Sequence, residues 1–118
     1  MSDVIRVAQR FMNQTAVYWA HLGDNAQGEP IFDEAVEIRC RWDDTHQEFI
    51  DQNGATVVSR AAVMVDRDTP ERGRLFLGTL EDLVSQTDPE ENYGAYEIRS
   101  FNKTPDRRGT KFARTAML

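Results

Sequence analysis

Two apolar runs on either side of a polar turn dominate the pattern of the chain, between residues 36 and 66. In the first run apolar and charged residues alternate, the apolar ones being Val36, Ile38, Cys40 and Trp42. This period of two is expected of a strand with one buried and one solvated face. The second run, residues 57–65, is rich in valine, and Asn53-Gly54 between the runs tolerates positive φ. The segment therefore predicts a strand, a hairpin and a return strand.

Shorter alternating runs occur elsewhere in the chain. They span residues 14–22, 74–78, 95–101 and 111–118. Clusters of Gly, Pro, Asn and Asp separate them, and one helical turn is expected from Thr79 to Val84 with Thr79 as its N-cap. Short strands with turn signals between them, and without an internal repeat, predict a mainly β fold. We expect a small antiparallel β-barrel of about six or seven strands.

The first dozen residues follow a different period. Val4, Val7 and Phe11 recur at helical spacing after Ser2, a possible N-cap. We therefore expect a short N-terminal helix or arm over residues 1–13 and the β-barrel domain over residues 14–118. So short a helix needs a surface to lie on, either its own barrel or a neighbouring molecule.

Length and composition limit the class of protein. A chain of 118 residues has room for one core. It has no run near the ~20 apolar residues that cross a bilayer, and its N-terminus lacks the order of a secretory signal. We expect a soluble protein, made in a cytoplasm, with no membrane partner. The single Cys40 excludes an intrachain disulfide and a two-cysteine metal site, and we interpret it as a small buried hydrophobe.

The net charge of −6 is unevenly distributed. Acidic residues prevail from 24 to 48 and from 81 to 91, whereas basic residues prevail from 97 to 114. These segments are either solvated faces or complementary surfaces that join copies of the chain head to tail.

Candidate catalytic and metal-binding residues are sparse. His21 and His46 are the only histidines. Asp66-x-Asp68 is followed by Thr69-Pro70, whereas a calcium loop needs a third oxygen ligand, a glycine at its sixth position and a glutamate at its twelfth. The chain contains neither a Gly-x-Ser-x-Gly elbow nor a glycine-rich phosphate loop. We expect no enzymatic activity, no metal and no cofactor.

A small nucleic-acid-binding β-barrel is the alternative interpretation. Such barrels bind single strands with aromatic side chains in a basic groove. The candidate strip is Arg99, Phe101, Lys103, Arg107, Arg108, Lys111 and Phe112. The negative net charge opposes this interpretation, because affinity for phosphates comes mainly from positive charge. Phe101 and Phe112 are more simply explained as core residues.

Three stretches of the chain resemble the head-completion proteins of tailed bacteriophages, the small head-closure, stopper and joining proteins of the neck. They are residues 15–32, 36–66 and 94–118, and their most specific elements are Cys40-Arg41-Trp42, Val57-Val58-Ser59-Arg60 and Tyr96-Glu97-Ile98-Arg99.

The resemblance implies a structural virion protein at the head-tail interface, assembled in the host cytoplasm. Its β-barrel would form a homo-oligomeric ring, sixfold or a multiple of it, between the portal or adaptor protein and the tail terminator or tail-tube protein. The ring would close the head after DNA packaging and offer a docking surface to the tail. Packaged double-stranded DNA would pass through its channel.

The resemblance also implies a channel loop at residues 46–55. Its tip would be Glu48, Phe49, Ile50, Asp51, Gln52, Asn53 and Gly54. Glu48 and Asp51 would then face DNA with negative charge, which repels the phosphates and lets DNA slide. The alternative is an ordinary hairpin at a subunit contact.

Three further groups are expected to contact other copies or other neck proteins. They are apolar residues of the arm, acidic residues near position 90 and basic residues near the C-terminus: Val4, Val7 and Phe11; Asp88, Glu90 and Glu91; and Arg107, Arg108 and Lys111.

Overall fold

The computed structural model describes residues 12–44, 46, 48–50, 53–105 and 112–118. Within these ranges 51% of the residues are in strands and 6% in helical turns, so the predicted mainly β fold is confirmed. The strands are β1 (Gln14–Trp19), β2 (His21–Asp24), β3 (Pro30–Phe32), β4 (Val36–Asp43), β5 (Glu48–Ile50), β6 (Thr56–Val58), β7 (Ala62–Val65), β8 (Arg74–Leu77), β9 (Ala95–Glu97), β10 (Ser100–Pro105) and β11 (Phe112–Met117). Two 3-10 turns, η1 (Leu80–Asp82) and η2 (Pro89–Glu91), lie between β8 and β9. The predicted helix at the N-terminus falls outside the described residues.

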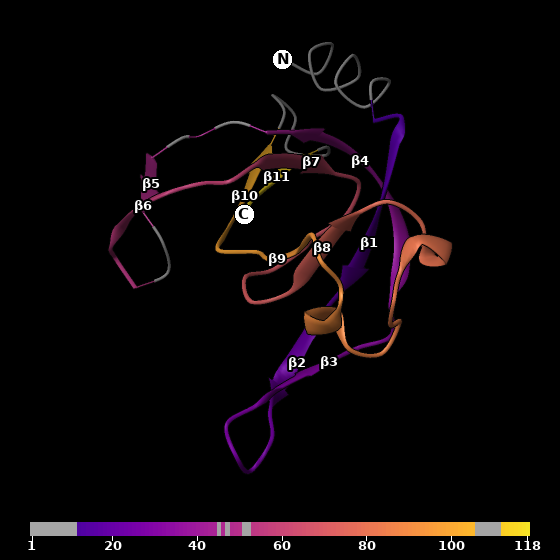
Figure 1. Cartoon of the computed structure of the whole chain (residues 1–118). Helices are drawn as coiled ribbons and strands as arrows, with labels where there is room; N and C mark the ends of the chain where they lie inside the picture. The colour runs from indigo at the N-terminus through magenta and orange to yellow at the C-terminus, as the bar shows by residue number, and fades with distance from the viewer. Residues whose placement is uncertain (1–11, 45, 47, 51–52, 106–111) are drawn as a thin grey trace.

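Seven strands form one antiparallel sheet, in the order β10-β11-β7-β4-β1-β8-β9 (Figure 1). The two edge strands, β9 and β10, are consecutive in the chain, with only Ile98 and Arg99 between them. Three Cα–Cα steps cover at most about 11 Å, so the edges of the sheet must approach each other. The amide of Ile98 donates to Gly73 O at 2.9 Å, and that of Arg99 donates to Met117 O at 2.8 Å. The sheet is therefore curled into a half-barrel, as the predicted small antiparallel barrel requires.

The main hydrophobic core fills the inside of this curl. Ile38 and Cys40 of β4 are 2% and 0% exposed, and Trp42 packs against the same core from a half-buried position. The alternation predicted for this strand is thus confirmed, except that Val36 at its start is 37% exposed. The other buried members are Ala16, Tyr18, Ala61, Val63, Val65, Leu75, Ile98, Ala116 and Leu118.

A second, smaller core lies on the outer face of β1. Val17 and Trp19 are both 0% exposed there, because side chains of neighbouring strands and of the segment between β8 and β9 cover them. The indole Nε1 of Trp19 donates to Gln86 O at 2.9 Å, which fixes that segment to the sheet. β1, which lies between β4 and β8 in the sheet, is consequently buried on both faces.

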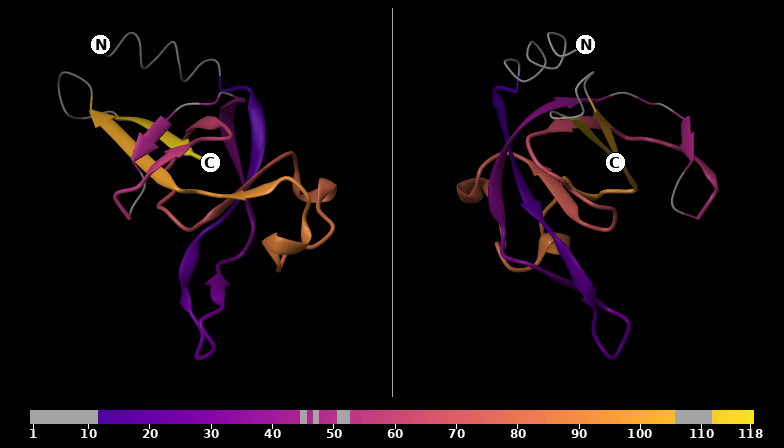
Figure 2. Two further views of the ribbon diagram at one scale, coloured as in Figure 1. Left: turned by 60° about the vertical axis from the view of Figure 1, so that its left-hand side comes forward. Right: turned by 180° about the vertical axis from the view of Figure 1, so that it is seen from behind.

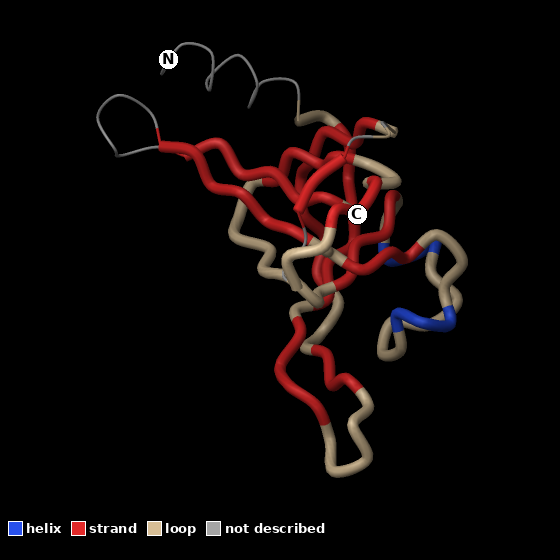
Figure 3. Tube along the Cα trace, turned by 90° about the vertical axis from the view of Figure 1, so that its left-hand side faces the viewer, coloured by secondary structure: helices blue, strands red, loops and turns tan. Residues whose placement is uncertain are grey.

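Two hairpins project from different sides of the half-barrel (Figures 1 and 2). β2 pairs with β3 in one of them, and β5 pairs with β6 in the other. The tube view shows how far the β2–β3 hairpin extends below the sheet (Figure 3). Gly54, at φ 81°, takes the left-handed backbone predicted for the turn after β5.

Three of the predicted strands are interrupted. The run 14–22 divides at Ala20 into β1 and β2, and the run 57–65 divides at residues 59–61 into β6 and β7. The run 95–101 divides at Ile98 and Arg99 into β9 and β10. In each pair the second strand has different partners from the first. Alternation continues through such a break because both halves have one buried face, so the sequence pattern alone does not reveal it.

The helical turn predicted after Thr79 is confirmed as η1, with Thr79 at its N-cap. The carboxylate of Asp82 accepts hydrogen bonds from the Thr79 amide at 2.9 Å and from its hydroxyl at 3.1 Å. In the described part of the chain, no helix has the length and apolar character needed to cross a membrane.

Candidate functional site

The predicted channel loop coincides with the β5–β6 hairpin. Glu48 and Ile50 lie on one face of β5, with Ile50 61% exposed, and Val58 across the ladder is 53% exposed. Phe49 lies on the opposite face and is half-buried. Asn53 and Gly54 form the turn, whereas Asp51 and Gln52 fall outside the described residues. The hairpin therefore presents a mixed acidic and apolar face to solvent.

Arg99 attaches this hairpin to the half-barrel. Its Nη2 donates to Val58 O at 2.6 Å and to Leu118 O at 3.0 Å, and its Cζ lies 5.4 Å from the centre of the Phe49 ring. Because Arg99 sits where the two edges of the sheet meet, one guanidinium joins the hairpin, the last strand and the junction. A charged donor on two carbonyl groups is a strong form of hydrogen bond.

A basic pocket opens beside the base of the hairpin. It measures about 440 Å³ and is lined by His46, Val58, Ser59, Arg60 and Arg99. The Arg60 guanidinium carbon lies 4.5 Å above the centre of the Tyr96 ring, and that ring is 6.5 Å from the Trp42 ring. This stacking holds an exposed cation in place at the rim of the pocket.

The acidic residues near position 90 gather on one short turn. The Asp88 carboxylate caps η2 by accepting from the Glu90 amide at 3.0 Å. Glu90 forms an ion pair with Arg74 at 2.8 Å, while Glu91 is exposed. The structure thus brings the predicted acidic group together, but the carboxylate of Glu90 already has an internal partner.

Asn92 holds the loop that carries these acids. Its side chain accepts hydrogen bonds from the amides of Val84 and Ser85, at 2.7 and 3.1 Å. It also donates to Ser85 O at 2.7 Å and to Asp88 O at 3.1 Å. Asn92 is only 5% exposed, so this side chain is the internal support of an otherwise irregular loop.

An acidic hollow of about 500 Å³ lies between this loop and the β2–β3 hairpin. It is lined by Glu29, Pro30, Ile31, Phe32, Thr87, Asp88 and Glu90. Ile31 is 45% exposed at its edge. Arg74 contacts both sides of the hollow, because it pairs with Glu90 and its Cζ lies 4.9 Å from the centre of the Phe32 ring.

The base of the β2–β3 hairpin contains a charged cluster. His21 Nε2 lies 3.0 Å from Asp24 Oδ1, and Arg72 Nη2 donates to both oxygens of Asp24, at 3.0 and 3.2 Å. The hydrogen bond with His21, together with Arg72, holds the pKa of Asp24 below its usual range. The cluster links the hairpin to Arg72, just before β8. Its three side chains do not include a serine, threonine or cysteine nucleophile.

Two basic residues near the C-terminus share one acidic partner. Asp68 accepts from Arg114 Nε at 2.7 Å and pairs with Lys103 at 3.4 Å. The hydrogen bond from Arg114, with Lys103 beside it, holds the pKa of Asp68 below its usual range. Lys103 and Arg99 of the candidate nucleic-acid strip are thus engaged within the molecule, and Phe101 packs against the main core.

Several predicted contact residues cannot be placed. Val4, Val7, Phe11, Arg107, Arg108 and Lys111 fall outside the described residues, and so does the side chain of Phe112.

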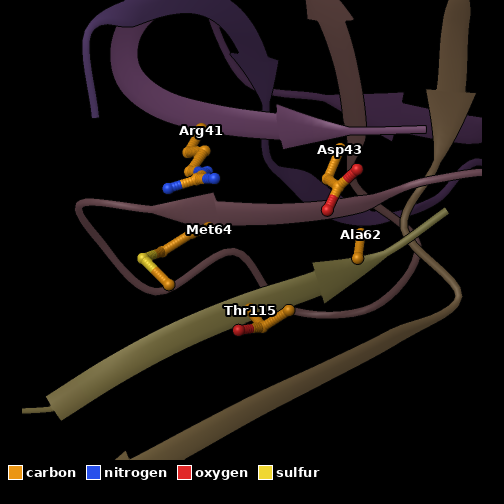
Figure 4. A pocket seen from close by; sticks show the side chains of 5 residues that line it. All are labelled: Arg41, Asp43, Ala62, Met64 and Thr115. Carbon is orange, nitrogen blue, oxygen red and sulfur yellow. The ribbon is translucent and has the colours of Figure 1, made fainter. Parts of the chain in front are cut away.

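A further hollow lies on the outer face of β4, β7 and β11 (Figure 4). It is lined by Arg41, Asp43, Ala62, Met64 and Thr115 and measures about 130 Å³. Among the described residues, no three His, Cys, Asp or Glu side chains come close enough to hold a metal ion. Cys40 is buried in the main core, where desolvation, and the nearby negative charge of Asp66, raise the pKa of its thiol to about 11.

Sequence reasoning missed the basic pocket and the Asn92 support. The basic pocket assembles from positions far apart in the chain, because Arg60 and Arg99 come together through Leu118. The Asn92 support is local, within residues 84–92, but it follows no regular period. The exposed Val58 belonged to a strand-like run, Ile31 lay outside every predicted strand, and neither carried a separate signal. No protein-family model, curated protein or solved structure matches this chain.

Proposed function

We propose that this protein is a structural component of the neck of a tailed bacteriophage. In this proposal it forms a ring between the portal or adaptor and the tail, closes the head after DNA packaging and gives the tail a docking surface. Support comes from the three stretches of sequence that resemble head-completion proteins. They include every described strand except β8, with β1 from its second residue. The chemistry proposed is binding and assembly, without catalysis.

The observation that carries the proposal is the projecting β5–β6 hairpin. The stretch from Val36 to Asp66 folds as a strand of the sheet, a hairpin outside the sheet, and a strand that pairs with the first. A half-barrel with a hairpin on one side suits a ring that positions a loop toward a central channel. Arg99 would keep that loop in place against passing DNA, because it binds main-chain oxygens at both the hairpin and the sheet.

The exposed face of the hairpin suits a channel wall. Beyond Val58, which borders the basic pocket at the base of the hairpin, its described members are Glu48, Ile50 and Thr56, so this part of the face has a carboxylate and an apolar side chain but no base. Such a face repels phosphates weakly and offers them no ion pair. DNA could then move past it without being held.

The proposal is tested in a phage whose genome encodes this chain. Deletion of the gene should leave heads that package DNA but retain it poorly, and free tails that do not join them, because both the closure and the docking surface are missing. Purified protein added to such a lysate should restore joined particles, counted by negative-stain electron microscopy and by plaque formation. A chain truncated after residue 94 lacks β9 to β11 and is the control, since it cannot close the sheet.

Normal joined particles in the deletion strain would exclude the neck function. Heads that never package DNA would also contradict it, because they would place the protein before DNA packaging.

A further inference from the structure

We infer that the basic pocket of one copy binds the acidic hollow of a second copy, and that this is the contact by which the chain assembles. The basic pocket is the one lined by His46, Val58, Arg60 and Arg99 at the base of β5–β6. The acidic hollow is the one lined by Glu29, Ile31, Asp88 and Glu90 beside β2–β3. The inference rests on the proposed ring and adds the surfaces that would build it.

The two surfaces complement each other in charge and in apolar character. The charged lining residues of each surface have one sign, and each surface has one exposed branched side chain, Val58 at 53% and Ile31 at 45%. On the acidic side Arg74 already pairs with Glu90, which leaves Glu29 and Asp88 for a second copy. Within the described residues, Arg60 forms no ion pair with a carboxylate, and Glu29 forms no ion pair with a basic side chain. Specific protein interfaces commonly combine an apolar centre with a charged rim, the rim of one partner having the sign opposite to that of the other.

Both surfaces are ordered before they bind. Arg60 is stacked on Tyr96, and Arg99 is fixed by two main-chain oxygens. On the acidic side Asp88 caps η2, and Asn92 ties the surrounding loop together. Association therefore costs little side-chain entropy, and a contact of modest area can be selective.

The positions of the surfaces on the molecule favour a ring. The hairpins that border them project from different sides of the half-barrel, so one copy can use both surfaces at once (Figures 1 and 2). A contact between two different patches leaves one free patch of each kind at the ends of a growing chain of copies. Such a heterologous contact closes into a ring when the rotation between neighbours permits it.

Charge exchange between two residues tests the contact. Arg60→Glu and Glu29→Arg should each weaken self-association of the purified protein at least about tenfold in sedimentation equilibrium. The double variant Arg60→Glu/Glu29→Arg should return to within about threefold of wild type, since it restores the pair with the charges exchanged. It also has the net charge of the wild type, so a general charge effect is excluded. Glu81→Arg, on an exposed residue of η1 that lines neither surface, is the matched control and should associate normally.

Disulfide trapping tests the geometry without a change of charge. In a variant with both Ile31→Cys and Val58→Cys, mild oxidation should produce a ladder of covalent oligomers, whereas each single variant should not. Cys40 does not compete, because it is 0% exposed. A wild-type protein that stays monomeric up to about 1 mM, equal association of all charge variants, or the absence of a ladder would each overturn the inference.

Failure of this inference is distinguishable from failure of the proposed function. If every charge variant restores joined particles in the deletion lysate, the neck function stands and the contact is wrongly placed. If even the wild-type protein restores none, the proposed function itself fails. Binding of the basic pocket to single-stranded DNA in place of a second copy would also overturn the inference.

Discussion

Replacement of Asn92 by alanine tests how the irregular loop before β9 is held. This buried side chain makes four hydrogen bonds within residues 84–92, two as acceptor and two as donor. The loop carries Asp88 and Glu90 and covers Trp19, so it supports both the acidic hollow and the outer core. The Asn92→Ala change removes all four bonds without adding bulk.

The expected loss follows from the groups left without partners. Two amides and two carbonyl groups lose their bonds, and each such bond contributes about 0.5–1.5 kcal/mol net. Part of the loss is recovered by water, because most neighbouring residues of the loop are exposed. We expect the free energy of unfolding to fall by about 2–4 kcal/mol, a large part of the 5–15 kcal/mol typical of a domain.

Urea unfolding followed by circular dichroism and tryptophan fluorescence measures this loss. The two probes should separate in the variant, since release of the loop breaks the bond from Trp19 to Gln86 before the sheet unfolds. Asn92→Asp should fall between wild type and Asn92→Ala, because it keeps the acceptor and loses the two donors. Asn102→Ala, at an exposed position of β10, is the control and should change stability by less than about 0.5 kcal/mol. A loss below about 0.5 kcal/mol for Asn92→Ala would refute the reasoning.

Three further predictions concern single groups and the nucleic-acid alternative. At pH 8 the Cys40 thiol should react with a thiol reagent at least about 100-fold more slowly in the native than in the unfolded protein. The reason is that this thiol is buried and its pKa is raised to about 11. A rapid reaction of the native protein would contradict the burial of Cys40. The pKa values of Asp24 and Asp68 are lowered in the folded state. The stability that these two carboxylates contribute is therefore fully present above the unfolded pKa, near about 4. It is lost as the pH falls through the folded pKa. Urea midpoints should therefore be flat from about pH 5 to 8 and fall below about pH 4, with a smaller fall in Asp68→Asn. In gel shifts at about 0.15 M salt, single-stranded DNA should bind weakly, because the net charge is −6 and both Lys103 and Arg114 pair with Asp68. A dissociation constant below about 1 μM that rises steeply with salt would instead favour the nucleic-acid-binding barrel.

The alternation of apolar and polar residues predicted the strands and turns that depend on near neighbours. Ile38 and Cys40 lie in the core, Gly54 takes positive φ in the predicted turn, and Thr79 begins a helical turn. These features follow from side-chain direction and backbone preference over two to four residues. They are therefore contained in the local sequence.

The local sequence did not predict the breaks within the predicted strands. Ile98 and Arg99 divide one alternating run into the two opposite edges of the sheet, although both halves keep the same period. Strand pairing depends on which distant strand completes the burial of each face, and a period of two carries no information about that partner.

The candidate surfaces also differ in whether they depend on near neighbours or on distant parts of the chain. The acidic group of residues 88–91 is local, so its members were expected together and do share one turn. The basic pocket unites Arg60 with Arg99 only because the sheet curls and brings Leu118 between them. The sequence by itself thus determined the β class, the turns and the local charge. Only the tertiary structure decided which charges meet, because closure of the sheet brings together residues that no local preference connects.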